Sequence, residues 1–177
     1  MMRPSQPAFV AMIFASALVT GSSQDLQAPK ADRIGFPKGY QSAFRQLRAK
    51  DQPDAKTAIV VYGNPAAASA KHGSYPYGSV IVMETWSTLQ DAGKNVLLDG
   101  NGHFRKDKVT GLHVMRKEHG FGEAYGENRT GEWEYVEYRP DDTYITPASA
   151  SAKCAACHLK AGEAKDFVYG GSRESNR

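Results

Sequence analysis

Cysteine is scarce in this sequence of 177 residues. There are only two, Cys154 and Cys157, and they lie three positions apart near the carboxyl end. Because a structural zinc site needs four ligands, the lack of a second cysteine pair argues against such a site. The spacing of the two thiols is then the main guide to their chemistry.

The sequence also lacks a strong charge bias and an internal repeat. Its 22 basic and 19 acidic residues leave a net charge of +3. That charge is too small to argue for nucleic acid or an anionic membrane as a partner. The composition therefore points away from both of these classes of binding protein.

Only one long apolar run is present, at residues 8–19, between Arg3 and a stretch of small and polar residues. This is the pattern of a secretory signal peptide, and the run is too short to span a bilayer comfortably. No cysteine follows it that a lipid could modify. We therefore expect residues 1–23 to be a cleaved signal peptide and residues 24–177 to form one domain. The expected product is soluble, without a membrane anchor, and most simply located in a bacterial periplasm.

Both cysteines belong to Cys154-Ala155-Ala156-Cys157-His158, a motif typical of c-type haem attachment. Two thiols at this spacing on a helical turn can each add to one vinyl group of the same porphyrin, and the adjacent histidine then reaches the iron. We predict one covalent haem c, with Cys154 and Cys157 as attachment points and His158 as the metal ligand. A thioredoxin-type disulfide is disfavoured because no βαβ pattern precedes the motif, whereas an inert structural disulfide stays open in an exported chain.

Apolar periodicity and turn residues predict several strands with helices near both ends. The apolar positions from Tyr40 to Leu47 favour a helix over residues 40–48. Asn64 and Pro65 are a typical cap and first residue of a second short helix. Strands are expected at 57–62, 80–86, 111–117 and 132–138, a loop at 120–131, and a helix carrying the haem motif, capped by Ser149 or Ser151. This order predicts an α+β fold with an antiparallel β-sheet and flanking helices.

Short motifs outside the haem sequence also carry information through their order. They are Phe36-Pro37-Lys38-Gly39-Tyr40, Val60-Val61-Tyr62, Tyr77-Gly78-Ser79-Val80-Ile81-Val82-Met83-Glu84, Gly131-Glu132-Trp133 and Asp166-Phe167-Val168-Tyr169. Together with the haem motif, this set resembles the cytochrome P-460 family and its relative cytochrome c′-beta. The resemblance extends from about Gly35 to Tyr169, which is nearly the whole expected mature chain.

The resemblance implies a small antiparallel β domain with helices, often a homodimer, with one haem near the carboxyl terminus. It implies that His158 is the proximal ligand, that Cys154 and Cys157 attach the haem, and that the opposite coordination position is open. Members of the family oxidise hydroxylamine, or bind nitric oxide or carbon monoxide without turnover.

Met83 marks a departure from the hydroxylamine-oxidising members of the family. They place a lysine at this position, in a Gly-x-Val-x-Val-Lys-Glu strand, and that lysine bonds covalently to the porphyrin edge. A thioether cannot form the same bond. Residues 146–153 also lack the carboxylate that some active members use on the distal side. The resemblance therefore implies that hydroxylamine oxidoreductase activity is disfavoured, and Met83 is expected at the haem as a pocket or core residue.

Two classes of function remain. The leading prediction is a cytochrome with five-coordinate iron that binds a small diatomic ligand such as nitric oxide. The alternative is a six-coordinate electron-transfer cytochrome that serves a redox partner protein, with Met83 or Met115 as sixth ligand. The candidates for binding the haem propionates are Arg45 and Arg48, with ordinary surface roles as the alternative.

Two further groups of side chains bear on the haem pocket. One group is expected to form an aromatic wall and consists of Tyr62, Tyr75, Tyr77, Trp133 and Tyr135. Ordinary core packing is the alternative for these residues. No role at the iron is assigned to the other histidines, which are His72, His103, His113 and His119.

Overall fold

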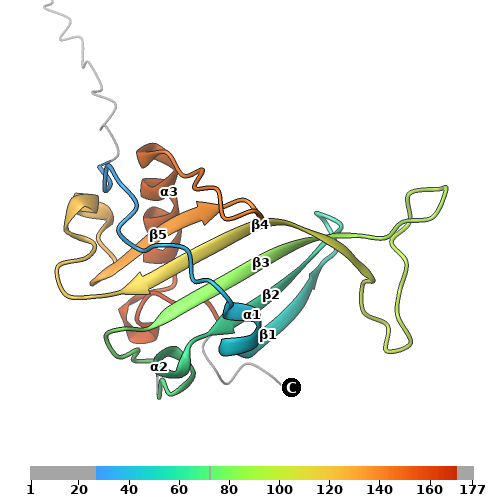
Figure 1. Cartoon of the computed structure of the whole chain (residues 1–177), viewed down its shortest axis with the longest axis horizontal. Helices are drawn as coiled ribbons and strands as arrows, with labels where there is room; N and C mark the ends of the chain where they lie inside the picture. The colour runs from blue at the N-terminus through green and yellow to red at the C-terminus, as the bar shows by residue number, and fades with distance from the viewer. Residues whose placement is uncertain (1–26, 72, 171–177) are drawn as a thin grey trace, which may run out of the picture.

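A computed structural model describes residues 27–71 and 73–170. The expected signal peptide and His72 lie outside the described residues. The centre of the fold is a five-stranded antiparallel sheet in the order β1-β2-β3-β4-β5 (Figure 1). The strands are β1 (Arg45–Gln52), β2 (Thr57–Gly63), β3 (Val80–Thr88), β4 (Lys106–Lys117) and β5 (Trp133–Tyr138). The helical elements are α1 (Tyr40–Ala43), α2 (Pro65–Ala68), η1 (Glu123–Asn128), α3 (Ala148–Leu159) and η2 (Glu163–Lys165). The predicted α+β class is confirmed.

The central strands form where the sequence is rich in β-branched and aromatic residues. In β3, Ile81 and Val82 pack into different cores on the two faces of the sheet, as the period of two requires. Antiparallel pairing sets Met83 opposite Val61 in β2 and opposite His113 in β4. Side chains from neighbouring strands therefore meet in rows on one face.

Each face of the sheet has its own apolar core. On one face, the chain before β1 packs in a core that contains Ile34, Tyr40, Val82, Leu112, Val114, Phe121, Val136 and Tyr138. On the other, α3 and the residues after it pack in a core that contains Ala67, Tyr75, Ile81, Met115, Tyr125, Trp133, Tyr135, Ala155 and Val168. In Figure 1 the amino-terminal segment crosses the front of the sheet and α3 lies behind β5. The haem motif therefore belongs to the second core.

The first predicted helix is wrong beyond its first turn. α1 ends at Ala43, Phe44 is extended, and β1 begins at Arg45, so the second half of the range 40–48 predicted as helix is strand. The periodicity of this segment is overridden because β1 pairs along the free edge of β2, with an irregularity between Gln46 and Arg48. The charged side chains of β1 suit an edge strand, since they discourage pairing with another sheet.

The second helix and the remaining strands follow the predictions closely. Asn64 caps α2, and its side-chain oxygen accepts a hydrogen bond from the Ala67 N–H at 2.9 Å. β4 begins at Lys106, earlier than predicted, and the loop predicted over 120–131 contains η1. No helix within the described ranges is long and apolar enough to cross a membrane.

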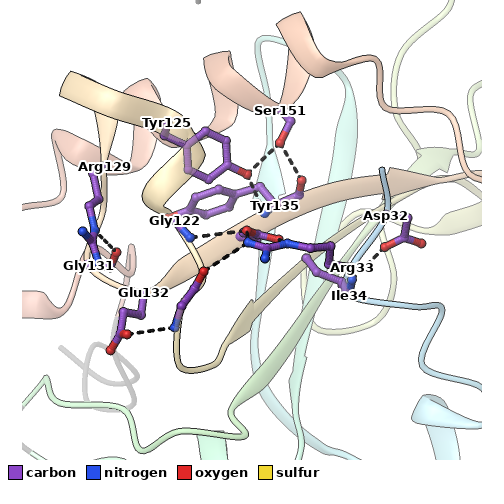
Figure 2. Close-up of polar contacts among 12 residues, drawn as sticks. Asp32, Arg33, Ile34, Gly122, Tyr125, Arg129, Gly131, Glu132, Tyr135 and Ser151 are labelled. Carbon is purple, nitrogen blue, oxygen red and sulfur yellow. Dashed lines mark hydrogen bonds and ion pairs between the residues drawn. The ribbon is translucent and has the colours of Figure 1, made fainter. Parts of the chain in front are cut away.

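α3 is attached to β5 by a closed set of buried hydrogen bonds (Figure 2). The Ser151 hydroxyl lies 2.7 Å from the Tyr125 hydroxyl and donates to the Tyr135 carbonyl oxygen at 2.9 Å, while the Tyr135 N–H donates to the Tyr125 hydroxyl at 3.1 Å. The expected serine cap is wrong, because Pro147 precedes the first turn and Ser151 lies inside the helix. These bonds fix the helix that carries the haem motif.

Candidate haem site

α3 presents the three predicted haem residues on one side. Cys154, Cys157 and His158 occupy helical positions i, i+3 and i+4, which are neighbours on a helix surface. All three line one cavity of about 290 Å³ between α3 and the sheet. Both cysteines are free thiols. The helix thus gives the two thiols and the imidazole access to the same space.

The cavity wall is mostly apolar and is built from every strand of the sheet and from the residues after η2. Its apolar side chains include Leu47, Val61, Ile81, Met83, Met115 and Val168. An apolar wall of this kind suits a large flat hydrophobic group with a few polar edges.

His158 is oriented by the chain that follows it. Its Nδ1 atom lies 2.7 Å from the Phe167 carbonyl oxygen. Because a carbonyl oxygen only accepts, Nδ1 carries the hydrogen and Nε2 keeps a lone pair, the arrangement found in metal-bound histidines. The ring also packs at 4.6 Å from the Tyr135 ring and 5.5 Å from the Tyr169 ring, between centroids. The geometry suits a neutral imidazole ligand.

Burial also sets the protonation of the two inner groups. It lowers the pKa of His158, which favours the neutral imidazole. Burial, with a smaller contribution from the negative charge of Glu137, raises the pKa of Cys154 to about 11. The Cys154 thiol is therefore protonated at neutral pH, before any bond to a cofactor forms.

Arg48 provides a test of whether a haem suits this cavity. Its side chain lines the cavity, and its Nε atom is buried without a hydrogen-bond partner among residues 27–71 and 73–170. A buried, unsatisfied guanidinium nitrogen is costly unless an acceptor arrives with the ligand. Haem carries two propionate carboxylates, so the residues present fit it. Of the two predicted arginines, only Arg48 lines the cavity; Arg45 is exposed on β1.

The structure brings Met83 and Met115 to the cavity together with His113, which sequence reasoning had not assigned to the site. His113 Nδ1 lies 3.0 Å from Glu137 Oε1, across the pairing of β4 with β5. The expected sheet position of His113 is confirmed. Its place beside Met83 follows from the β3–β4 register. The sequence does not determine that register, because it does not show where each strand ends and so how long the connecting loop is.

The other histidines of the described chain lie elsewhere. His103 is 3.3 Å from Asp51, and His119 packs against Tyr77 with ring centroids 3.6 Å apart. Neither residue lines the cavity. Within residues 27–71 and 73–170, no group of three or more His, Cys, Asp or Glu side chains could hold a metal ion.

Part of the expected aromatic wall is present. Tyr75 and Tyr135 line the cavity, and Trp133 packs behind Tyr75 at 5.7 Å between ring centroids. Tyr62 packs with the core on the opposite face, and Tyr77 is 44% exposed. These two residues are therefore not part of the wall.

Tyr169 also lines the cavity and had not been assigned to it. Its hydroxyl donates to the Cys157 carbonyl oxygen at 2.7 Å. The only available signal was its position soon after the haem motif, inside one of the family-like segments.

The comparisons agree with this geometry. The family model for Cytochrome P460 matches residues 37–170, which include the sheet, α3 and the whole cavity wall. A search of curated proteins gives no match. Since the family model covers most of the chain, the protein belongs to the cytochrome P460 family and is a haem cytochrome of the c type.

Proposed function

We propose that this protein is an exported, periplasmic cytochrome in which a single haem is attached through Cys154 and Cys157. His158 is the proximal iron ligand, and the distal side of the iron is open to a small neutral ligand such as nitric oxide. The haem supplies an iron that binds diatomic molecules. The side chains of the chain orient that iron and determine which molecules reach it.

The observation that carries the proposal is the arrangement around His158. Its Nδ1 is bound to the Phe167 carbonyl oxygen, and the ring lies in the same cavity as both thiols. A histidine held in this tautomer has its Nε2 lone pair ready for a metal, without a proton to lose first. The haem motif and the tautomer therefore support the same assignment.

The character of the cavity supports a neutral diatomic ligand. The wall is mostly apolar, and its aliphatic and thioether side chains offer no hydrogen bonds to a charged or strongly hydrated molecule. Such molecules lose solvation on entering, whereas nitric oxide and carbon monoxide lose little. Met83 in place of the family's cross-linking lysine supports binding over hydroxylamine oxidation.

A second candidate function is single-electron transfer by a six-coordinate haem. It is favoured by one observation, that both Met83 and Met115 line the cavity and carry thioether sulfurs that bind haem iron in other cytochromes. The two functions differ in the ligation of the ferric iron.

The test is the optical and electron-spin spectrum of the ferric protein. An open distal site predicts high-spin iron and rapid binding of carbon monoxide and nitric oxide after reduction. Methionine ligation predicts low-spin iron with a weak far-red band, slow uptake of carbon monoxide, and loss of that band in Met83→Leu or Met115→Leu. Ile81→Leu, which repacks the same wall without removing sulfur, is the matched control.

A further inference from the structure

The residues that follow η2 adopt an unusual backbone next to His158. Asp166 and Phe167 are consecutive residues in the left-handed region, with φ of 49° and 59°. Non-glycine residues rarely adopt this conformation, and it costs free energy unless the surroundings determine it. Something outside the segment must therefore hold residues 166–169 in place.

The carboxylate of Asp166 has three donors from three parts of the fold. The Tyr75 N–H donates to Oδ2 at 2.9 Å and Lys117 Nζ lies 2.6 Å from the same oxygen, while Trp133 Nε1 donates to Oδ1 at 3.3 Å. The Lys117 and Asp166 side chains are 15% and 14% exposed. Hydrogen bonds to ionised groups with this little solvent access are stronger than those between neutral groups.

These three donors are fixed in the sheet framework. Tyr75 lies in the loop before β3, Lys117 is the last residue of β4, and Trp133 is the first residue of β5 and fully buried. Asp166 thereby ties the chain after the haem motif to the sheet.

The same short segment contacts the haem motif on its other side. The Phe167 carbonyl oxygen accepts from His158 Nδ1 at 2.7 Å, and the Tyr169 hydroxyl donates to the Cys157 carbonyl oxygen at 2.7 Å. Val168 between them is 5% exposed. The Phe167 carbonyl, one residue after Asp166, thus accepts the only N–H hydrogen that the neutral His158 imidazole can donate.

We propose that Asp166 is a positioning residue for the proximal histidine. Its three hydrogen bonds hold residues 166–169 in the left-handed conformation that directs the Phe167 carbonyl oxygen to His158 Nδ1. The inference rests on the proposed function, in which His158 is the iron ligand. It adds what determines how strongly His158 Nε2 donates electron density to the iron. A hydrogen bond accepted from Nδ1 raises the basicity of Nε2, which favours oxidised over reduced iron.

The experiment compares Asp166→Asn with Asp142→Asn in the haem-loaded protein. Asparagine has the shape of aspartate and tolerates left-handed backbone, so the first change removes the charge and one acceptor without changing volume. Asp142 is an exposed aspartate that also has a left-handed φ of 66°, and it does not line the cavity. It is therefore a matched control for the substitution itself.

The readouts are the iron–histidine stretching band of the ferrous protein and the midpoint potential, with haem content measured alongside. For Asp166→Asn we expect the band at lower frequency and the equilibrium constant for reduction raised about tenfold, equivalent to ~59 mV for one electron. Asp142→Asn should match the wild type in both. Lys117→Gln replaces the charged donor by a shorter, neutral amide and should shift both readouts in the same direction by less, which keeps the test available if Asp166→Asn does not fold.

The inference is overturned if folded, haem-loaded Asp166→Asn has the same band and midpoint potential as the wild type. If Lys117→Gln is the only variant that folds, the same result in that variant overturns it. His158→Ala separates this failure from failure of the proposed function. If His158→Ala abolishes the band while Asp166→Asn preserves it, only the positioning role is wrong. If His158→Ala also preserves the band, the proximal assignment of His158 is wrong, and the role of Asp166 falls with it.

Discussion

Met83 is the residue on which the chemistry of the haem edge depends most. It lies on β3 and lines the cavity together with both thiols. We expect peptide mapping of the haem-loaded protein to find two thioether links, at Cys154 and Cys157, and no third bond between the porphyrin and a side chain. Hydroxylamine should be oxidised slowly or not at all, because a thioether cannot form the lysine link. A porphyrin bond to another side chain, or rapid hydroxylamine turnover, would show that a different residue has replaced the lysine.

The candidate site also shows which residue assignments the sequence supports. The spacing of Cys154, Cys157 and His158 places them on one side of a helix whatever the rest of the fold is, because the helical repeat alone determines it. The positions of three other lining residues depend on strand register and on the path of the chain after α3. These residues are Arg48, His113 and Tyr169. Those features are set by long-range packing, so Arg48 could not be separated from Arg45, and His113 and Tyr169 were missed.

At the scale of single elements, the position of α3 depends on the Tyr125 hydroxyl. It is the partner of both the Ser151 hydroxyl and the Tyr135 N–H. Tyr125→Phe leaves the buried N–H without an acceptor, so we expect it to lower the free energy of unfolding by about 1–3 kcal/mol. The measurement is urea unfolding, with Tyr144→Phe as the control because Tyr144 is 39% exposed. Equal stability of Tyr125→Phe and the wild type would contradict a role for this hydroxyl in fixing α3.

The elements differ in how far local sequence determines them. β3 and β5 were predicted close to their observed bounds, because a run of β-branched and aromatic residues ended by turn residues is a local property. α2 was predicted for a similar reason, since Asn64 and Pro65 act within one helical turn. The burial of β3 and β5 on both faces was not predicted, since it depends on the packing of distant segments. The first half of β1 was predicted as helix because a charged edge strand has no apolar alternation of its own and forms only by pairing with β2.

For the whole molecule, buried tyrosines predict a loss of stability at alkaline pH. Burial, the largest cause in each case, raises the pKa of Tyr40, Tyr135 and Tyr138, and hydrogen bonds to Glu84 and Asp32 raise the pKa of Tyr40 and Tyr138 further. The unfolded tyrosines ionise near pH 10, so above that pH the unfolded state loses protons that the folded state keeps. Stability is therefore complete below about pH 10 and falls as the pH rises, by about 1.4 kcal/mol per pH unit for each such tyrosine.

Denaturant unfolding of the haem-loaded protein at pH 9 and pH 11 measures this loss. Tyr138→Phe should reduce the difference between the two pH values, because it removes one of the hydroxyls that stays protonated in the folded state. A free energy of unfolding that is equal at both pH values would contradict the account of these buried hydroxyls.

The central claim for the whole molecule is that one haem is bound covalently to the exported chain through Cys154 and Cys157. Intact-protein mass spectrometry, after production with a cytochrome c maturation system, tests it most directly. The account predicts a single mass equal to the chain without its signal peptide plus one haem, and no haem on a variant in which both cysteines are replaced by alanine. A wild-type mass equal to the bare polypeptide, with the two thiols joined as a disulfide, would contradict it.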